Sequence, residues 1–302
     1  MAKAIFTTRV NPSYDDLPEF FYHFPKQYLS RVESVLDDWG AYYEPSRIGD
    51  GSSRRDGRKA YFATTKVIGI REDPQRQGHY YADVTDYREF DRPVPFRKGD
   101  LFYESALKNP KGEPATGVFQ NAVRAVPDEE YNLILEAGFA TIIGEEAIPK
   151  PDALQPGLRE EQLPLQRPIT EYLTKRPFRD AAFKHNVRLA YNSTCAMTGI
   201  KLINGGGRCE IEAAHIRPIG DGHNGPDSVR NGLALSRTVH WMFDRGLVSL
   251  SNEYKIFTAQ ELIPERVIQL FQPDMEIQLP DNPAFQPHCQ FLEYHRDTIF
   301  KG

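Results

Sequence analysis

Cysteine and long apolar runs are scarce in this chain of 302 residues, and it has no internal repeats. Its three cysteines, Cys195, Cys209 and Cys289, are widely spaced and odd in number, so we expect neither a disulfide framework nor a four-cysteine zinc site. No stretch approaches the roughly 20 apolar residues of a membrane span. Residues 1–9 lack the apolar core of a signal peptide. We therefore expect a cytoplasmic protein with no membrane partner.

An overall excess of positive charge is also missing, since the formal net charge of −5 argues against a polyanionic partner. The charge is unevenly distributed, however, because residues 174–250 contain eleven Lys or Arg and six Asp or Glu. That segment has a net charge of +5, so the rest of the chain carries −10. A basic segment is typical of a surface that binds phosphate groups. The candidate phosphate contacts are Arg217, Arg237 and Arg245, and the alternative is a solvated surface of mixed charge.

Length and composition favour about two domains with packed cores, because 302 residues exceed a typical single domain and 40% of them are apolar. A boundary is indicated by proline. Residues 145–168 form neither a long helix nor a central strand, because they hold five prolines among acidic residues. The sequence therefore predicts one domain over residues 1–144, a proline-rich linker over 145–170 and a second domain over 171–302.

The most informative residues of the second domain are His215, Asn231 and His240, which lie in one short, turn-rich segment. His215 follows a strand-like run over residues 209–214, and the glycine-rich residues 220–226 read as a loop in which the chain reverses. A helix is predicted from Ser236 or Arg237, because Val239, Met242 and Phe243 recur at helical spacing. His240 and Asp244 are four residues apart on that helix, so both side chains point from one face and can share a metal ion.

These residue types suit the hydrolysis of a phosphodiester bond. The reaction needs a deprotonated water in line with the leaving oxygen and a cation that takes up charge on the phosphate. A neutral imidazole can accept the proton of water near pH 7. This chemistry explains why such residue types would occur together.

The order and spacing of residues 212–218, 229–235 and 239–246 resemble the His-Asn-His (HNH) nucleases, also called ββα-metal nucleases. The resemblance implies that His215 is the general base, that Asn231 fixes the loop that orients it, and that His240 binds a divalent metal ion, Mg²⁺ or Mn²⁺. Asp244 stands where some members carry a further ligand, and its alternative is a salt bridge with Arg245 or Arg217. This chain has Ala214 where many members have an Asp or His ligand, so the resemblance does not identify the complete set of metal ligands.

The segments around this motif are predicted to pack against it. Residues 177–191 have helical apolar spacing, and residues 254–258 read as a strand. Residues 261–271 and 291–300 are predicted helices. We interpret His185 and His295 as structural and His223 as exposed to solvent.

The first domain is rich in strand-like runs. Residues 61–70 and 79–84 alternate in the manner of a hairpin, with a turn-rich segment over 71–78 between them. Residues 90–96 read as a proline-limited edge or loop, and helices are predicted over 25–38 and 129–137. The result is a small, twisted mixed sheet or barrel with helices at its edge, so the whole chain is an α+β protein.

This pattern resembles the PUA superfamily, which includes SRA and EVE domains, over the run of residues 61–95 and over 123–126. The resemblance implies a pocket in which a flipped or single base is held between aromatic rings and read by hydrogen bonds. The candidate cage consists of Trp39, Tyr42, Tyr43 and Tyr22, and the alternative is that these aromatics form the core.

Together the two resemblances imply a modification-dependent restriction endonuclease that binds double-stranded DNA containing 5-methyl- or 5-hydroxymethylcytosine. A single HNH site cuts one strand, so a double-strand break implies two binding events or a homodimer, which we expect. One alternative is an HNH nuclease acting on RNA or unmodified DNA. Another is a binding module whose nuclease site has decayed, which Ala214 suggests and the intact His215, Asn231 and His240 oppose.

Overall fold

The computed structural model describes residues 2–9, 16–46, 57–144, 173, 175–204 and 208–302. The proline-rich linker predicted over 145–170 lies outside these residues. The chain divides into two compact units, Met1–Ala182 and Phe183–Gly302. No helix of the described ranges has both the length and the apolar character that crossing a membrane would require.

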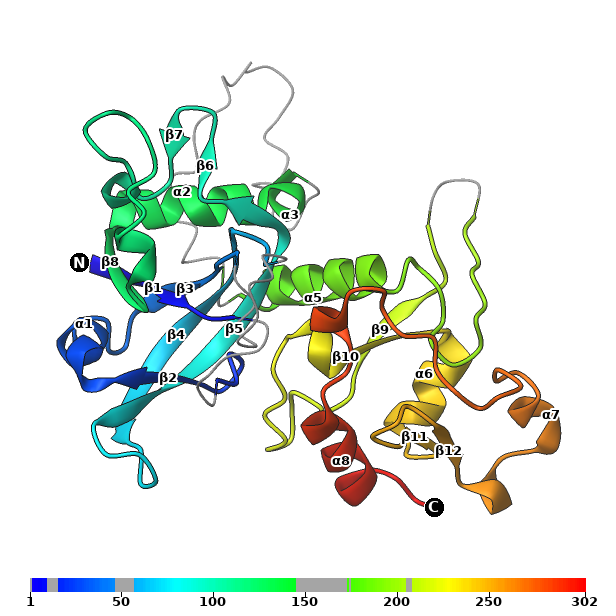
Figure 1. Ribbon diagram of the computed structural model, residues 1–302. Helices are drawn as coiled ribbons and strands as arrows, with labels where there is room; N and C mark the ends of the chain where they lie inside the picture. Colours follow the sequence, from blue (N-terminus) through cyan, green and yellow to red (C-terminus); the bar gives the residue numbers. More distant parts are fainter. Residues whose placement is uncertain (1, 10–15, 47–56, 145–172, 174, 205–207) are drawn as a thin grey trace, which may run out of the picture. The chain divides into compact units, whose positions relative to one another are not determined.

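The first unit is built on a curled half-barrel sheet of six strands in the order β2-β5-β4-β3-β1-β8 (Figure 1). Strands β1 and β3 are parallel, and the other neighbours are antiparallel. The register of the long β4–β5 hairpin shifts at three places, and such bulges bend a strand and increase its twist. The strands are β1 (Ala2–Thr7), β2 (Phe21–Pro25), β3 (Trp39–Glu44), β4 (Ala60–Glu72), β5 (His79–Pro95) and β8 (Val123–Pro127).

The predicted hairpin over residues 61–70 and 79–84 is confirmed by β4 and β5, and of the two alternatives for 90–96, a proline-limited edge or a loop, the structure has the edge. Strand β5 continues to Pro95, with Val94 opposite Tyr61. Prolines are tolerated in this part of the strand because β2 pairs with β5 only between His79 and Asp83. Beyond that point β4 is the partner strand of β5 among the described residues. A proline nitrogen, which has no N–H to donate, can therefore face the open edge of the strand.

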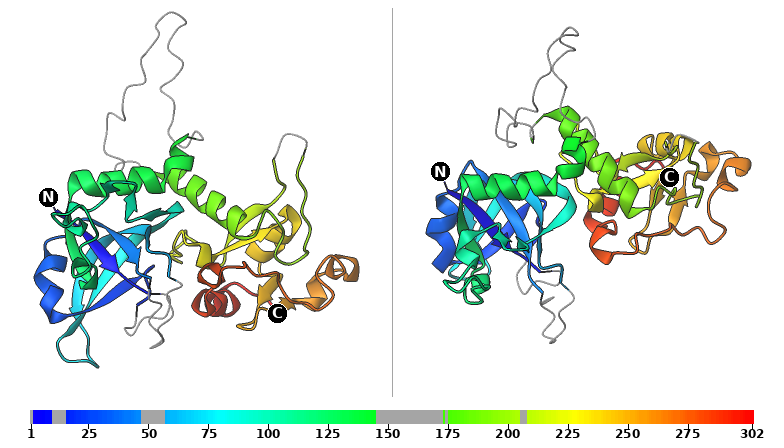
Figure 2. Two further views of the ribbon diagram at one scale, coloured as in Figure 1. Left: turned by 45° about the horizontal axis from the view of Figure 1, so that its top comes forward. Right: turned by 90° about the horizontal axis from the view of Figure 1, so that it is seen from above.

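Helices cover the sheet of the first unit, and α2 lies along one of its faces (Figure 2). The predicted helix over 129–137 is confirmed as α2 (Asp128–Gly138), whose first turn carries three acidic residues that favour a helix N-terminus. The helix predicted over 25–38 is much shorter, because Pro25 belongs to β2 and Asp37 has a positive φ. The remaining elements are η1 (Lys26–Tyr28), α1 (Leu29–Glu33), β6 (Arg97–Lys98), β7 (Leu101–Phe102), η2 (Ser105–Leu107), η3 (Val118–Gln120) and α3 (Ala140–Gly144).

Helix α5 (Arg176–Ala190) contains the division between the units. Its first half belongs to the first unit because Phe178 and Ala182 pack into the same core as Phe139. Its second half belongs to the second unit, where Phe183 stacks on His215. The division therefore falls later in the chain than the predicted start of a second domain at residue 171.

The second unit is organised around a β9–β10 hairpin and the helix α6 that follows it. The predicted helix start is confirmed, since α6 begins at Arg237 with Ser236 as its N-cap. The strand predicted over 209–214 begins only at Glu212, because Cys209 pairs with Ile203 in an isolated bridge. The elements are β9 (Glu212–His215), η4 (Val229–Asn231), β10 (Gly232–Leu235), α6 (Arg237–Asp244), β11 (Val248–Leu250) and β12 (Ile256–Thr258).

The C-terminal tail corrects one predicted helix and confirms another. Residues 261–271 do not form a continuous helix, because Pro264 has an extended backbone and precedes only a short turn of α-helix. The helix predicted over 291–300 is present as α8, two residues earlier. The tail consists of η5 (Gln260–Leu262), α7 (Glu265–Ile268), η6 (Pro283–Phe285) and α8 (Cys289–Thr298).

Candidate active site

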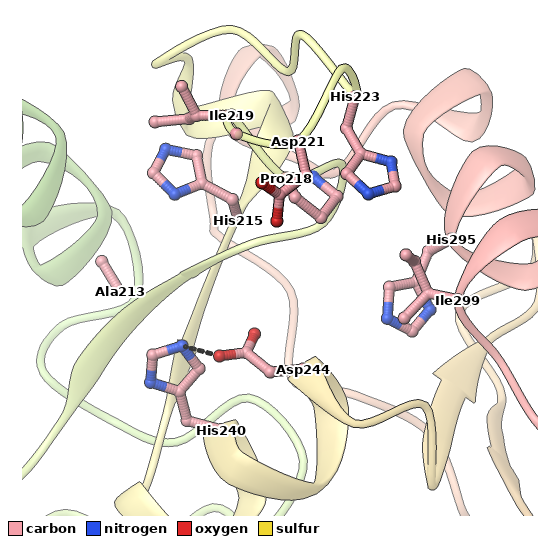
Figure 3. A pocket seen from close by; sticks show the side chains of 11 residues that line it. Ala213, His215, Pro218, Ile219, Asp221, His223, His240, Asp244, His295 and Ile299 are labelled. Carbon is pink, nitrogen blue, oxygen red and sulfur yellow. Dashed lines mark ion pairs between the residues drawn. The ribbon is translucent and has the colours of Figure 1, made fainter.

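A cavity of about 440 Å³ in the second unit brings together three of the predicted site residues. His215 comes from the end of β9, and His240 and Asp244 come from α6 (Figure 3). Figure 3 shows His215 on one side of the opening, with His240 and Asp244 facing it from the other. The other lining residues are Ala213, Pro218, Ile219, Gly220, Asp221, His223, His295 and Ile299.

His215 is held on two sides. Its ring stacks on Phe183 with a centroid distance of 3.7 Å and an interplanar angle of 9°. Its Nε2 lies 3.0 Å from Oδ1 of Asp227, whose side chain is only 2% exposed. The opposite residue on β10 is Gly232, where a Cβ would lie 2.5 Å from Val187 and 3.1 Å from the Phe183 ring. Glycine at that position therefore allows α5 to approach closely enough for Phe183 to support His215.

Asn231 is fully buried and does not line the cavity. Its Oδ1 accepts a hydrogen bond from the N–H of Arg217 at 2.8 Å. Its Nδ2 donates to the carbonyls of Arg217 and Pro226, both at 2.9 Å. These three bonds join the two ends of the loop that follows His215. Gly225 packs in the same loop, where a Cβ would lie 1.9 Å from the carbonyl oxygen of Arg217.

His240 contacts a carboxylate through each ring nitrogen. Nδ1 lies 2.9 Å from Oε2 of Glu212, and Nε2 lies 3.3 Å from Oδ2 of Asp244. The hydrogen bond with His240 lowers the pKa of the Glu212 carboxyl below its usual value, and Arg237 adds to this effect. Burial raises the pKa of Asp244, while the nearby rings of His240 and His215 act in the opposite direction. Asp244 is thus electrostatically coupled to both histidines of the cavity.

The structure explains the position of Ala214. Alternate residues of a strand face opposite sides, and the cavity is lined by Ala213 and His215. Ala214 therefore faces away from the cavity and is completely buried. Glu212 lies on the same side of β9 as Ala214 and does not line the cavity. Its carboxylate therefore contacts His240 from the side that faces away from the cavity.

The residues that face the cavity suit a divalent cation. Among the described residues no group of three or more His, Cys, Asp or Glu side chains has the arrangement of a metal site. Nε2 of His240 and the half-exposed carboxylate of Asp244 are the adjacent groups that line the cavity. A carboxylate suits Mg²⁺ or Mn²⁺, an imidazole is a ligand of divalent transition metals, and Mg²⁺ commonly keeps several positions for water and substrate phosphate.

The three predicted phosphate contacts have different surroundings. The guanidinium of Arg217 donates to the carbonyl of His223 and lies 4.3 Å from the centroid of the Tyr294 ring, so it packs within the loop. Arg237 and Arg245 are exposed, although Nε of Arg237 is 3.1 Å from Glu212. His223 corrects a prediction, because Nδ1 bonds to the Tyr294 hydroxyl at 2.8 Å and the residue is only partly exposed.

Sequence reasoning missed Asp227 and Glu212 as partners of the histidines. Glu212 stands inside the motif that resembles the HNH family, but its role depends on which face of β9 it occupies. Asp227 lies just beyond a loop that reads as a simple connection. No spacing rule predicts that this loop returns its carboxylate to within 3.0 Å of Nε2 of His215.

His295 lines the same cavity but is held as a structural residue. Its ring stacks on Phe243 at 3.8 Å, Nδ1 lies 2.9 Å from the Ser249 hydroxyl, and Nε2 donates to the Phe243 carbonyl at 3.2 Å. Burial lowers the pKa of His295 to about 4. The folded protein therefore prefers the neutral ring.

This low pKa predicts a loss of stability in mild acid. In the unfolded chain histidine titrates near pH 6.5, so the stabilisation is complete above that pH and is lost as the pH falls toward 4. We expect the free energy of unfolding to be about 2 kcal/mol lower at pH 5 than at pH 7.5 from this residue alone. Urea unfolding at both pH values measures it. His295→Gln keeps a donor for Phe243 without the titration, so an equal pH effect in both proteins would contradict the assignment.

The aromatic cage predicted for the first unit needs correction. Trp39 and Tyr43 pack in one core cluster, and Tyr22 and Tyr42 pack in another. Tyr42 and Tyr43 are neighbours on β3, so their side chains face opposite sides of the sheet. All four are buried, and they do not form a single cage. The alternative, that these aromatics form the core, is the one the structure supports.

A second cavity, of about 330 Å³, lies in the first unit and includes one of these aromatics. Tyr22 lines it, and its hydroxyl donates to the carbonyls of Thr7 and Ala122. Asp16 contributes a carboxylate that is 3.2 Å from the Thr8 hydroxyl. The other lining residues are Arg9, Pro25, Gln27, Tyr28, Pro45, Phe119 and Gln120.

The chain was compared with solved structures, curated proteins and protein families. The chain is similar to a solved "Modification dependent TagI restriction endonuclease" with a TM-score of 0.34 and 15% sequence identity, over 98% of this chain and 81% of that one. No curated protein matches the chain. Residues 195–251, which hold β9, β10 and α6, match the family described as HNH endonuclease. Residues 195–251 therefore form an HNH endonuclease domain, and the protein is a nuclease.

Proposed function

We propose that the protein is a divalent-metal-dependent endonuclease that cuts duplex DNA and selects DNA containing modified cytosine. The observation that carries the nuclease part is the cavity shared by His215, His240 and Asp244 within the HNH endonuclease domain. The selection of 5-methyl- or 5-hydroxymethylcytosine is assigned to the first unit. It is the finer part of the proposal and has its own test.

In the proposed reaction His215 accepts a proton from a water molecule in the cavity. The resulting hydroxide attacks phosphorus, the bond to the leaving oxygen breaks, and that oxygen takes a proton from solvent. Asn231 acts at a distance by joining the ends of the loop that follows His215. His240 and Asp244 would hold Mg²⁺ or Mn²⁺, which when bound neutralises charge that builds on the phosphate.

A polyanionic substrate suits the charge and surface of α6. Arg237 and Trp241 are four residues apart on α6 and share one face of it, Arg245 follows α6 as its C-cap residue, and all three are exposed. Trp241 is 59% exposed although tryptophan is usually well buried. Two guanidinium groups and an open aromatic face beside His240 are groups that bind phosphates and bases.

The proposed reader site is the cavity at Tyr22 rather than the predicted four-residue cage. The rings of Tyr28 and Phe119 and the oxygens of Thr8 and Asp16 all line it. Aromatic faces hold a base removed from the stack, and carboxylate or hydroxyl groups read its edge. The resemblance to base-binding PUA-superfamily domains also supports this assignment.

Cleavage of matched plasmids tests the proposal. Unmodified, 5-methylcytosine and 5-hydroxymethylcytosine plasmids are incubated with Mg²⁺ or Mn²⁺, beside an RNA of the same sequence. We expect cutting of modified DNA only, and no cutting with EDTA. Equal cutting of all three plasmids would remove the modified-base reader and keep the nuclease. Preference for RNA, or cutting that persists in EDTA, would overturn the proposal.

The same plasmids report how both strands are cut. One HNH site hydrolyses one strand, so we propose that a homodimer supplies the second site. The linear product should then appear where the mass in solution is that of a dimer. A monomeric mass together with complete double-strand cutting would contradict the homodimer.

A further inference from the structure

His215 and His240 differ in how carboxylates surround their rings. In His215, Nε2 lies 3.0 Å from Asp227. His240 lies between two carboxylates, with Nδ1 2.9 Å from Glu212 and Nε2 3.3 Å from Asp244. A neutral imidazole has one N–H and one lone pair, and an ionised carboxylate can only accept a hydrogen bond. In the neutral ring of His215 the nitrogen that faces the carboxylate therefore carries the proton.

The carboxylates of Asp227 and Glu212 lie behind their histidines. His215 and His240 line the cavity, whereas Asp227 and Glu212 do not. Asp227 is also the more deeply buried of the two acids, with 2% of its side chain exposed compared with 42% for Glu212. Asp227 can therefore reach neither a substrate phosphate nor a cation in the cavity directly. The hydrogen bond to His215 links it to a residue that lines the cavity.

The ring of His215 has little freedom to turn away from this arrangement. Phe183 covers one face of it in a nearly parallel stack, and a flip of the ring would take Nε2 away from Asp227. The ring plane and the proton position are thus fixed by two different neighbours. Nδ1 is therefore the ring nitrogen that is left to interact with a molecule in the cavity.

We propose that Asp227 is a positioning residue that keeps the proton of His215 on Nε2 and leaves Nδ1 to accept the proton of water. The acceptor role of Nδ1 rests on the proposed nuclease reaction, whereas the position of the proton does not.

Nitrogen NMR of the unmodified protein measures the proton positions directly. Two-bond ¹H–¹⁵N correlation spectra of histidine-labelled protein distinguish Nδ1–H, Nε2–H and doubly protonated rings, and the variants His215→Ala and His240→Ala assign the signals. We expect Nε2–H for His215 at the pH of cleavage. An Nδ1–H tautomer or a doubly protonated ring at His215 would overturn the proposal.

The variant Asp227→Asn tests the effect on the reaction. An amide can either donate or accept, so the tautomer is no longer fixed, and loss of the carboxylate beside a general-base histidine can cost up to about 10⁴ in kcat. We expect kcat to fall about a hundredfold or more, KM for DNA to stay the same, and a second tautomer of His215 to appear. Asp281→Asn, an exposed acid of the same unit, is the matched control. An unchanged kcat, or a lower kcat with an unchanged His215 spectrum, contradicts the role.

Failure of the proposed function and failure of this inference can be told apart, because the spectra need neither DNA nor metal. A protein that cuts no nucleic acid but carries the proton of His215 on Nε2 would refute the nuclease proposal and keep this inference. A protein that cuts DNA with the proton of His215 on Nδ1 would refute only this inference. If Asp227→Asn does not fold, the spectrum of the unmodified protein still decides it.

Discussion

Replacement of His215 by alanine is expected to reduce the rate of DNA cleavage by about 10²- to 10⁴-fold, the range that a general base contributes. His215 is positioned for this role because it lines the cavity opposite His240 and Asp244 and is supported by Phe183 and Asp227. The measurement is the single-turnover rate of plasmid nicking at saturating metal. Binding of DNA in EDTA should stay within about threefold of the unmodified protein, since no phosphate contact is assigned to this ring.

The control for this prediction is His185→Ala. His185 is on α5, close in sequence to Phe183, and it does not line the cavity. Its replacement should leave the nicking rate unchanged. A His215→Ala protein that nicks DNA within about tenfold of the unmodified rate would show that another group takes the proton.

Replacement of Asn231 by alanine is expected to lower the free energy of unfolding by about 3 kcal/mol, because each buried polar group left without a partner costs about 1–3 kcal/mol. The side chain is fully buried, and its three hydrogen bonds satisfy the N–H and carbonyl of Arg217 and the carbonyl of Pro226. Alanine leaves all three backbone groups without that partner. Urea unfolding at pH 7.5 measures the change.

The same substitution should slow cleavage even where the protein remains folded. Asn231 joins the ends of the loop that carries Asp227 back toward His215, so its loss should loosen the position of the base. Asn252→Ala is the matched control, since Asn252 bonds to Glu293 on an exposed surface and its loss should cost less than about 0.5 kcal/mol. A loss below 1 kcal/mol for Asn231→Ala would mean that water replaces its hydrogen bonds.

The core of the candidate site was predictable because it is local in sequence. His215, Asn231 and His240 lie on a strand, a turn and a helix within 26 residues, so short-range signals of alternation, glycine and helical spacing place them. The cavity unites His215, His240 and Asp244 as the helix spacing implied. Asp227 and Glu212 were not predictable as partners, because their contacts depend on the path of a loop and on the face of a strand.

In the first unit the sequence patterns predicted the hairpin correctly and the aromatic cage wrongly. The hairpin of β4 and β5 follows from alternation, and the structure confirms it. The aromatic cage joined Tyr42 and Tyr43, although neighbours in a strand must point to opposite faces. The cavity at Tyr22 combines Asp16, Tyr28 and Phe119, which are brought together only by the tertiary fold. No local pattern connects residues so far apart in the chain.

A fragment that works as a nuclease needs the second half of α5. The family match begins at Cys195, yet Phe183 and Val187, which support His215 and cover Gly232, lie before it. A fragment cut at Cys195 would expose one face of the His215 ring to water and uncover the back of the hairpin. The first half of the same helix belongs to the other core through Phe178. A cut within the second half of this helix therefore removes packing from the second unit, and a nuclease fragment needs residues upstream of the family match.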